Sequence, residues 1–201
     1  PSPSSTAPDP GGCTPPDNPA QLLITVPACQ PAAALTAGLA GGSGRVRHLD
    51  ADLADPAAPA AVVAAARGLF GPIDVLVANH ARSSEQGIGT LTAAELDRSH
   101  AVNVRATLLL IQEYAEQHDD ARPGGRVITF TSGQHASPMP NELPYAASKA
   151  ALAGLTGSLA AALAPRGITA NCVDPGPTDT GYADESARRA VARRVPLGRW
   201  G

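Results

Sequence analysis

The chain has 201 residues, of which 43% are hydrophobic and 3% aromatic, and this length suits one domain. Its formal net charge is −3, so the composition gives no sign of the basic surface that binds nucleic acid. Its three cysteines lack CxxC spacing and fit neither a disulfide framework nor a zinc site, which favours a reducing cytoplasm. No apolar run approaches membrane-spanning length, and the first residues lack the basic and apolar regions of a signal peptide, so no membrane partner is expected.

Residues 1–20 carry seven prolines among Ser, Gly and Asp. This composition predicts a flexible or extended leader, followed by a single domain over residues 21–201. The chain begins at Pro1 and not at methionine, which is consistent with a processed or truncated piece.

The first part of the domain alternates between apolar runs and helix-forming stretches. Residues 22–26 form a short apolar run, and residues 31–40 have the pattern of a helix. A strand is expected at 46–51 and an alanine-rich helix at 56–70, closed by Gly71-Pro72. Residues 74–79 (DVLVAN) are an apolar run bounded by polar residues, as expected of a buried parallel strand.

The second part continues this alternation. The string Thr92-Ala-Ala-Glu95 is a capping box that opens a long helix toward Glu116, and residues 126–131 (RVITFT) form another strand. A helix at 145–165 carries small residues nearly all round, which favours burial on most faces, and a last strand follows at 168–173. Strands alternating with helices predict a parallel, doubly wound α/β sheet, whose ligands collect at the carboxyl ends of the strands.

Lys149 is the single lysine among fifteen basic residues, and it follows Tyr145 by four positions. Residues four apart lie on one face of a helix. An ammonium beside a phenol favours the phenolate form. The pair therefore predicts a tyrosine that acts as an acid or a base near neutral pH.

Further polar residues stand beyond the expected strand ends, and Asn103 lies in the long helix between two of them. This set resembles the short-chain dehydrogenase/reductase family, from about residue 46 to residue 201. That family has a helix asparagine, a serine, and a tyrosine with a lysine four residues on, which match Asn103, Ser132, Tyr145 and Lys149. Tyr-x-x-x-Lys alone recurs by chance, whereas the whole set in this order is specific.

Three further strings carry the resemblance. The family's acidic-apolar pair after its third strand matches Asp52-Leu53, and its Pro-Gly-x-x-x-Thr signature matches residues 175–180. Its Pro-Leu-Gly-Arg string resembles residues 196–199. The resemblance implies a Rossmann-like fold, incomplete at the first strand and at the C-terminus.

The resemblance also implies a role for each catalytic residue. Tyr145 would protonate a carbonyl oxygen as hydride arrives, or deprotonate an alcohol in reverse. Lys149 would assist the tyrosine and hydrogen-bond the nicotinamide ribose. Ser132 would donate to the substrate oxygen where charge develops, and Asn103 would hold a water that relays protons toward Lys149.

The implied cofactor is NAD or NADP. NADPH is slightly favoured over NADH, and only by what is usual in the family. Asp52-Leu53 would meet the adenine, and Asn79 the adjacent ribose. The nicotinamide amide would be held by the loop that contains Pro175, Gly176, Thr178 and Thr180. The expected partners are a small carbonyl or alcohol substrate, of the kind that 3-oxoacyl reductases take, and further copies of the chain in a homodimer or homotetramer.

The sequence departs from the family at its start. The family opens with a strand and a Thr-Gly-x-x-x-Gly-x-Gly turn that receives the pyrophosphate, and nothing in these residues matches it. Residues 22–26 resemble the family's second strand by their distance from Val46, although they could take the first strand's place. The usual Asn-Asn-Ala-Gly string is replaced by Ala78-Asn79-His80-Ala81. Weak binding of dinucleotide is therefore expected of these 201 residues.

Other candidate sites are weaker. Ser132 with His135 does not make a hydrolase nucleophile, because Gly-x-Ser-x-Gly is absent, and the five histidines lack metal-ligand spacing. Four arginines after the last strand are either a solvated charged face or a grip on a phosphorylated carrier such as coenzyme A or acyl carrier protein, namely Arg188, Arg189, Arg193 and Arg194.

Two functions follow from these observations. The first is an NAD(P)-dependent oxidoreductase that interconverts a carbonyl and an alcohol. The second is a non-catalytic remnant of the family that serves as a binding or dimerisation module. A glycine-rich turn encoded upstream of Pro1 in the parent reading frame would favour the first.

Overall fold

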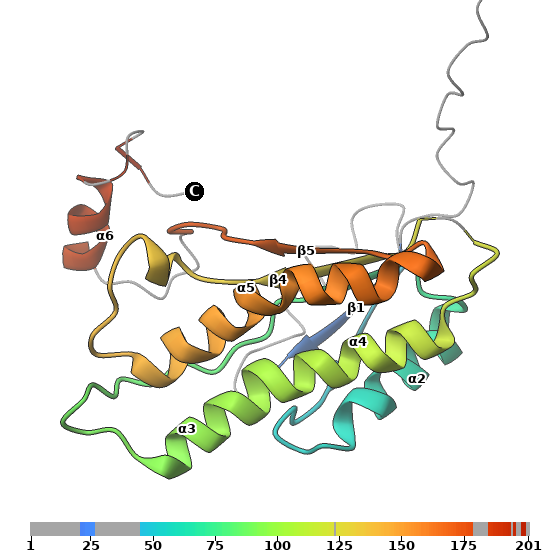
Figure 1. Cartoon of the computed structure of the whole chain (residues 1–201), viewed down its shortest axis with the longest axis horizontal. Helices are drawn as coiled ribbons and strands as arrows, with labels where there is room; N and C mark the ends of the chain where they lie inside the picture. Colours follow the sequence, from blue (N-terminus) through green and yellow to red (C-terminus); the bar gives the residue numbers. More distant parts are fainter. Residues whose placement is uncertain are drawn as a thin grey trace, which may run out of the picture.

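A computed structural model describes the backbone of residues 21–26, 45–122, 124–178, 185–193, 195 and 198–199. The expected leader at 1–20 and the expected helix at 31–40 lie outside the described residues. Over the described part, parallel strands alternate with helices, so the predicted α/β class with a Rossmann-like arrangement is confirmed (Figure 1).

The described strands form two parallel sheets. β1 (Gln21–Val26) pairs with β2 (Arg45–Asp50), and the second sheet has the order β3 (Val75–Ala78), β4 (Arg126–Phe130), β5 (Thr169–Val173). Among the described strands β1 pairs with β2 and not with β3, which is the place expected of the family's second strand. One edge of β3 is therefore without a partner strand among the described residues.

Helix α2 (Ala58–Phe70) connects the two sheets. It begins with a proline in its first turn, where the missing N–H costs nothing, and it ends at Gly71, whose φ of 84° suits glycine. Val62 and Val63 of α2 pack with Leu110 in a small apolar cluster that also touches β2 and β3. This cluster holds the two sheets together.

The expected long helix after Thr92 is interrupted. It consists of α3 (Ala93–His100), a π-helical turn η1 (Ala101–Arg105) and α4 (Ala106–Gln117). Thr92 caps α3 by accepting the Glu95 N–H, but the Glu95 carboxylate pairs with Arg82 and does not close the capping box. The sequence does not signal the π-turn, because its single extra residue leaves the apolar spacing nearly unchanged.

Helix α5 (Leu143–Leu163), continued by the 3₁₀ turn η3 (Ala164–Arg166), packs on β4 and β5. By length and composition alone, residues Leu143–Arg166 could cross a membrane, which corrects the expectation that no apolar stretch reaches that length. The expectation of burial on most faces was wrong as well, since five residues of α5 are buried. Small residues such as Ala150 and Gly154 made the helix look like a core element but lie exposed.

The larger core cluster lies between α4, α5 and the three-stranded sheet. It contains Ile111, Tyr114, Val127, Leu163, Ile168 and Ala170. The Tyr114 hydroxyl donates to Asp74 O at 2.8 Å and accepts from the Arg126 N–H at 3.1 Å, so it joins α4 to the starts of β3 and β4. Burial raises the pKa of Tyr114.

Helices α2, α4 and α5 all lie on one side of the strands (Figure 1). The residues of β3 that point to the opposite side, Val75 and Val77, are 48% and 49% exposed, and Val173 of β5 is 40% exposed. A doubly wound sheet has helices on both faces. Within the described residues, this face of the sheet carries no helix.

Candidate active site

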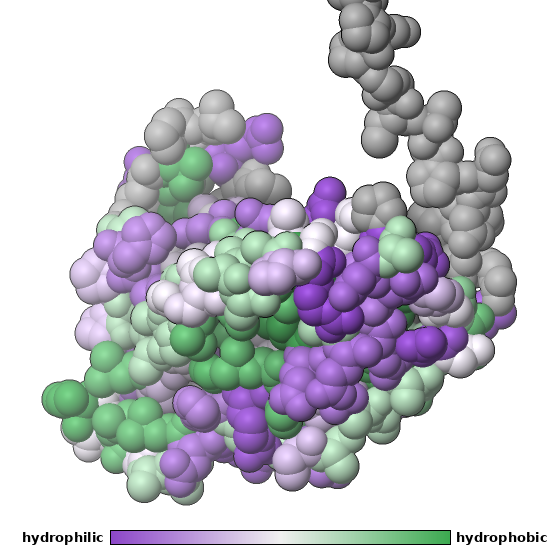
Figure 2. Space-filling model, turned by 45° about the vertical axis from the view of Figure 1, so that its right-hand side comes forward, coloured by the Kyte–Doolittle hydropathy of each residue, from purple (hydrophilic) through white to green (hydrophobic). Residues whose placement is uncertain are grey.

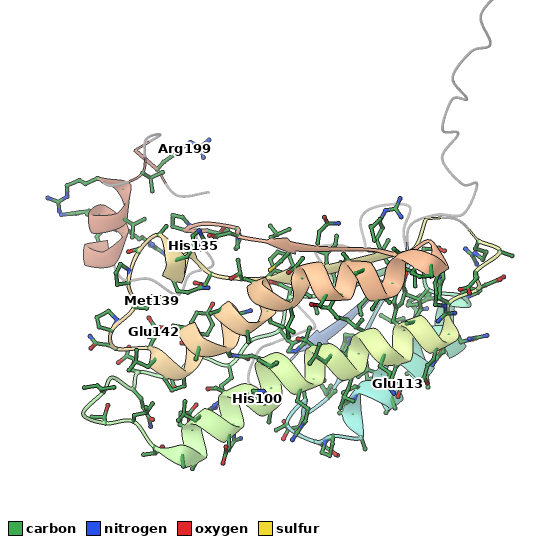
Figure 3. All side chains as sticks on the ribbon, in the orientation of Figure 1. His100, Glu113, His135, Met139, Glu142 and Arg199 are labelled. Atoms are coloured by element: carbon green, nitrogen blue, oxygen red, sulfur yellow. The ribbon has the colours of Figure 1, made fainter. Side chains whose placement is uncertain are left out.

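Polar residues gather where the parallel strands end. Asn79 follows β3, Ser132 follows β4, and Asp174-Pro175-Gly176 follows β5. The register places Ala78, Thr129 and Cys172 side by side, so the residues that follow them lie at one edge of the sheet. This edge is where ligands of α/β proteins bind. His135, Met139 and Glu142 mark the segment between β4 and α5, which borders this edge (Figure 3).

Tyr145 and Lys149 lie in the first turns of α5, as expected from their spacing. The Lys149 Nζ lies 5.8 Å from the centre of the Tyr145 ring, within the range of a cation–π contact. Lys149 is 2% exposed, whereas Tyr145 is partly exposed. The helix therefore holds a buried ammonium beside a phenol that solutes can reach.

The surroundings of Lys149 fix its position. Its Nζ donates to Phe130 O, at the end of β4, at 3.0 Å. Its own backbone oxygen accepts from Thr131 Oγ1 at 3.2 Å. Burial lowers the pKa of Lys149, and the Cys172 thiol opposes this shift. Phe130 thus binds the side chain of Lys149, and Thr131 binds its backbone oxygen.

Ser132 is partly exposed, and its Oγ donates to the Met139 Sδ at 3.8 Å. A thioether sulfur is a weak acceptor. A substrate oxygen could therefore replace it without the loss of a strong hydrogen bond. This geometry suits the donor role expected of Ser132.

Asn103 is fully buried in the π-turn, and its carboxamide is engaged on both ends. Its Oδ1 accepts from the Arg82 N–H at 2.6 Å, and its Nδ2 donates to Arg82 O at 2.9 Å and to Ser148 Oγ at 2.8 Å. Ser148 Oγ in turn donates to Tyr145 O at 2.7 Å. The side chain of Asn103 thus joins the loop after β3 to the helix that carries Tyr145, and the expected water relay stays a prediction.

The loop after β3 is held by a second contact. The Arg82 guanidinium makes two hydrogen bonds of 2.8 Å to the Glu95 carboxylate, which is 12% exposed. The Arg82 hydrogen bonds lower the pKa of Glu95 to about 2, and Ser99 Oγ donates to the same carboxylate at 3.1 Å. Both Arg82 contacts fix the segment that leads away from Asn79.

Of the residues expected to bind the cofactor, Asp52, Asn79, Pro175, Gly176 and Thr178 are exposed, and Leu53 is 7% exposed. The Asp52 carboxylate accepts from the Ala54 N–H at 2.9 Å, and the Gly176 N–H donates to Asp174 Oδ1 at 3.1 Å. Both contacts order short turns at strand ends. Thr180 lies outside the described residues.

Two other features lie outside this set of residues. Arg189 of α6 (Glu185–Ala192) is exposed and pairs with Glu185 at 2.9 Å, which favours a solvated charged face over a grip on a phosphorylated carrier.

An open cavity of about 600 Å³ lies between the loop after β3 and the start of α5. It is lined by Gly87, Ile88, Gly89, Thr90, Pro140, Asn141 and Leu143. Leu143 is the first residue of α5 and precedes Tyr145 by two positions, and Tyr145 is not among these lining residues.

Sequence reasoning missed His80, Arg82, Glu95, Thr131 and Ser148. Ser148 stands inside the Tyr-x-x-x-Lys string, and Thr131 directly precedes Ser132, so proximity to the motifs could have indicated both. His80 stands where the sequence departs from the family's usual string. The pairing of Arg82 with Glu95 leaves no sequence signal, because loop geometry brings them together.

The sequence model for "short chain dehydrogenase" matches residues 18–190 of the chain. "Uncharacterized oxidoreductase YjdA" of Bacillus subtilis is 37% identical over 158 residues, which are 78% of this chain and 63% of that protein. "3-oxoacyl-[acyl-carrier-protein] reductase FabG" of Rickettsia felis is 33% identical and shares 64% of this chain and 54% of its own. The chain thus spans less than two thirds of the length of these curated relatives.

Solved structures agree with this match. A short chain dehydrogenase from Burkholderia cenocepacia, crystallised in complex with NADP, is 35% identical and superimposes with a TM-score of 0.79. The shared part is 89% of this chain and 74% of that one. Because the family model covers far more than half of the residues, the chain belongs to the short-chain dehydrogenase family.

Proposed function

We propose that the protein is an NAD(P)-dependent oxidoreductase that interconverts a carbonyl and an alcohol by hydride transfer, on a substrate of the 3-oxoacyl type. The observation that carries the proposal is the buried Lys149 ammonium beside the Tyr145 ring, at the carboxyl end of the sheet. Burial of an ammonium is costly unless it is paired and hydrogen-bonded. The similarity to a 3-oxoacyl reductase supports the substrate class.

The residues present fit a nicotinamide nucleotide. An ammonium has three donors, and Phe130 O accepts from one of them at 3.0 Å. Within the described residues no carboxylate lies in ion-pair contact with Lys149, so its other donors suit uncharged acceptors such as ribose hydroxyls. When bound, the nicotinamide gives or takes the hydride. The NADP complex of the Burkholderia relative supports NADPH over NADH as the cofactor of this protein, in line with the preference that the family resemblance implies.

The side chains of the site divide the proton chemistry. Tyr145 gives a proton to the carbonyl oxygen in reduction and takes one from the alcohol in oxidation. Ser132 donates to the same oxygen while negative charge develops there. The Lys149 ammonium favours the ionised form of Tyr145 and orients the ribose.

Self-association is proposed through the outer faces of α4 and α5. Ala150, Gly154, Gly157 and Ala161 are exposed and recur on one face of α5. Figure 2 shows weakly polar and apolar residues across the middle of the face that α4 and α5 present. A two-fold contact there would allow close helix packing. Leu152 of the same helix is 2% exposed and packs inside the protein, so it does not belong to this face.

The alternative is a non-catalytic binding or dimerisation module. The sequence offers no glycine-rich turn for a pyrophosphate, and β3 has an unpartnered edge within the described residues. Both observations favour this alternative over catalysis by these 201 residues alone. The catalytic side chains are nevertheless present and close together, which a binding module does not require.

Calorimetric titration of the chain with NADPH and NADH tests the proposal, followed by a screen of carbonyl substrates. We expect binding weaker than micromolar, because each missing charge-assisted hydrogen bond to the pyrophosphate is worth ~1.5–3 kcal/mol. Lys149→Met should remove the remaining binding. An absence of both binding and turnover would favour the module, and micromolar or tighter binding would contradict the expected loss at the pyrophosphate.

A further inference from the structure

His80 lies between the strand β3 and the π-turn that carries Asn103. Its Nε2 lies 3.0 Å from Val102 O and 3.3 Å from Thr107 Oγ1. A carbonyl oxygen can only accept, so Nε2 carries the hydrogen. The mostly buried ring therefore donates to the backbone of η1.

The π-turn creates the need for this donor. In an α-helix the N–H of Ala106 would donate to Val102 O, but here it donates to Ala101 O, five residues back. The Val102 carbonyl thus loses its α-helical partner, and the His80 ring takes that place. The next carbonyl, Asn103 O, accepts from Thr107 Oγ1 at 2.8 Å. Because that hydroxyl donates to Asn103 O, it meets His80 as an acceptor.

We infer that His80 is a positioning residue that stabilises the π-helical turn and thereby places the Asn103 carboxamide between Arg82 and Ser148. His80 donates to Val102 O in η1. Asn103 Nδ2 donates to Arg82 O and to Ser148 Oγ, and Ser148 Oγ donates to Tyr145 O. The end of β3 is in this way connected to the first turn of α5. The part of the inference that concerns catalysis rests on the proposed function.

The charge state of the ring is consistent with this role. Burial lowers the pKa of His80 to about 4, the hydrogen bond to Val102 opposes the shift, and the Lys149 charge adds to it. The ring is therefore neutral at physiological pH and keeps a single donor. A second cation beside Lys149 would disfavour the lysine charge on which the site depends.

Amide hydrogen exchange in the full chain tests the inference without any need for turnover. His80→Leu removes the donor, and we expect the Arg82 and Ala106 amides to exchange about tenfold faster relative to Val127 in β4. His80→Gln keeps an N–H donor and should restore much of the protection. His100→Leu is the matched control, since His100 is exposed at the end of α3 beside the π-turn (Figure 3).

The outcomes separate the two proposals. Unchanged exchange of Arg82 and Ala106 in His80→Leu would overturn the positioning role, and so would an equal rise at every core amide, which indicates general destabilisation. Rescue by His80→Gln supports it. In a form of the protein that shows turnover, His80→Leu should lower kcat about tenfold with little change in KM, whereas a lack of turnover in all variants would refute only the proposed function.

Discussion

Lys149 Nζ donates a hydrogen bond to Phe130 O at 3.0 Å, which connects the catalytic helix to the last residue of β4. The side chain is 2% exposed, so the space around its head group is set by packed neighbours. A larger cation in this place would have to displace the strand end or the Tyr145 ring.

Lys149→Arg should therefore impair the protein although it keeps the charge. The planar guanidinium is larger than an ammonium and does not lose its proton. We expect weaker dinucleotide binding, at least a tenfold loss of reductase activity and a pH–rate profile shifted to higher pH. Full activity with an unchanged profile would mean that the single lysine is an accident of composition. Lys149→Met is the uncharged control and should be inactive.

Tyr145→Phe should remove the transferable proton while it leaves the packing of the ring nearly unchanged. A general acid is typically worth ~10²–10⁴ in rate. Loss of nicotinamide absorbance with a carbonyl substrate should slow by at least that much, while dinucleotide affinity changes little. Near-normal turnover would exclude Tyr145 as the acid.

Acid should weaken the Arg82–Glu95 pair within a defined pH window. Because the pKa of Glu95 is lowered from 4.5 to about 2, the folded state binds fewer protons than the unfolded state in between. The contribution of the pair is present above pH 4.5 and is lost as the pH falls toward about 2. The difference corresponds to roughly 3 kcal/mol at 1.4 kcal/mol per pKa unit.

The contribution of the Arg82–Glu95 pair to the free energy of unfolding should be only about 1–2 kcal/mol, because the Arg82 side chain is 35% exposed and water screens the pair. Glu95→Gln should destabilise the protein by that amount at pH 7 and by much less near pH 2.5, as measured by urea unfolding at each pH. A difference independent of pH would show that the carboxylate charge is not the stabilising element.

Gly125→Ala should destabilise the start of β4. An added Cβ would lie 2.8 Å from Ile168 Cγ1 and 2.9 Å from His118 Cε1, both of them in side chains that are buried. Overpacking of this kind typically costs ~1–3 kcal/mol. Gly68→Ala is the matched control, because nothing lies within 4 Å of its added Cβ in α2, and alanine there should stabilise the helix by up to ~1 kcal/mol. Thermal unfolding of both variants would distinguish the two effects.

Self-association should depend on the exposed face of α5. Gly154→Arg adds a long charged side chain where nothing lies within 4 Å, so the single chain should tolerate it. We expect sedimentation velocity at tens of micromolar, above typical obligate-dimer affinities, to show at least a dimer for the unaltered chain and a monomer for Gly154→Arg. A monomer without any substitution would contradict the proposed assembly, and Gly68→Arg in α2 is the control.

The sequence allowed the fold class and most strands to be predicted because period and composition are local properties. Residues 74–79 became β3 and residues 126–131 became β4, each within about two residues, since parallel strands are continuous apolar runs. The Tyr145–Lys149 contact followed from helical spacing. The expected burial of α5 was wrong, because its small residues suit a solvent-exposed helix face as well as a packed one.

The supporting contacts of the site could not be predicted. The contacts of the Asn103 carboxamide with Arg82 and Ser148 were not foreseen, because the π-turn aims this side chain at the loop after β3. No residue pattern announces a π-turn. In the sequence, His80 stands out only as a departure from the family's usual string. Its role depends on the Val102 carbonyl, which would keep its backbone partner in a regular helix.

The separation of the two described sheets has a consequence for local unfolding. Among the residues that the structure describes, the β1–β2 pair and the three-stranded sheet are separate hydrogen-bonded units, and the cluster of Val62, Val63 and Leu110 is smaller than the cluster around Tyr114. Native proteins open locally in contiguous units whose stability follows their buried contacts. The β1–β2 unit should thus be the more labile foldon, able to detach and re-form while Tyr145, Lys149 and their strand-end partners stay in place.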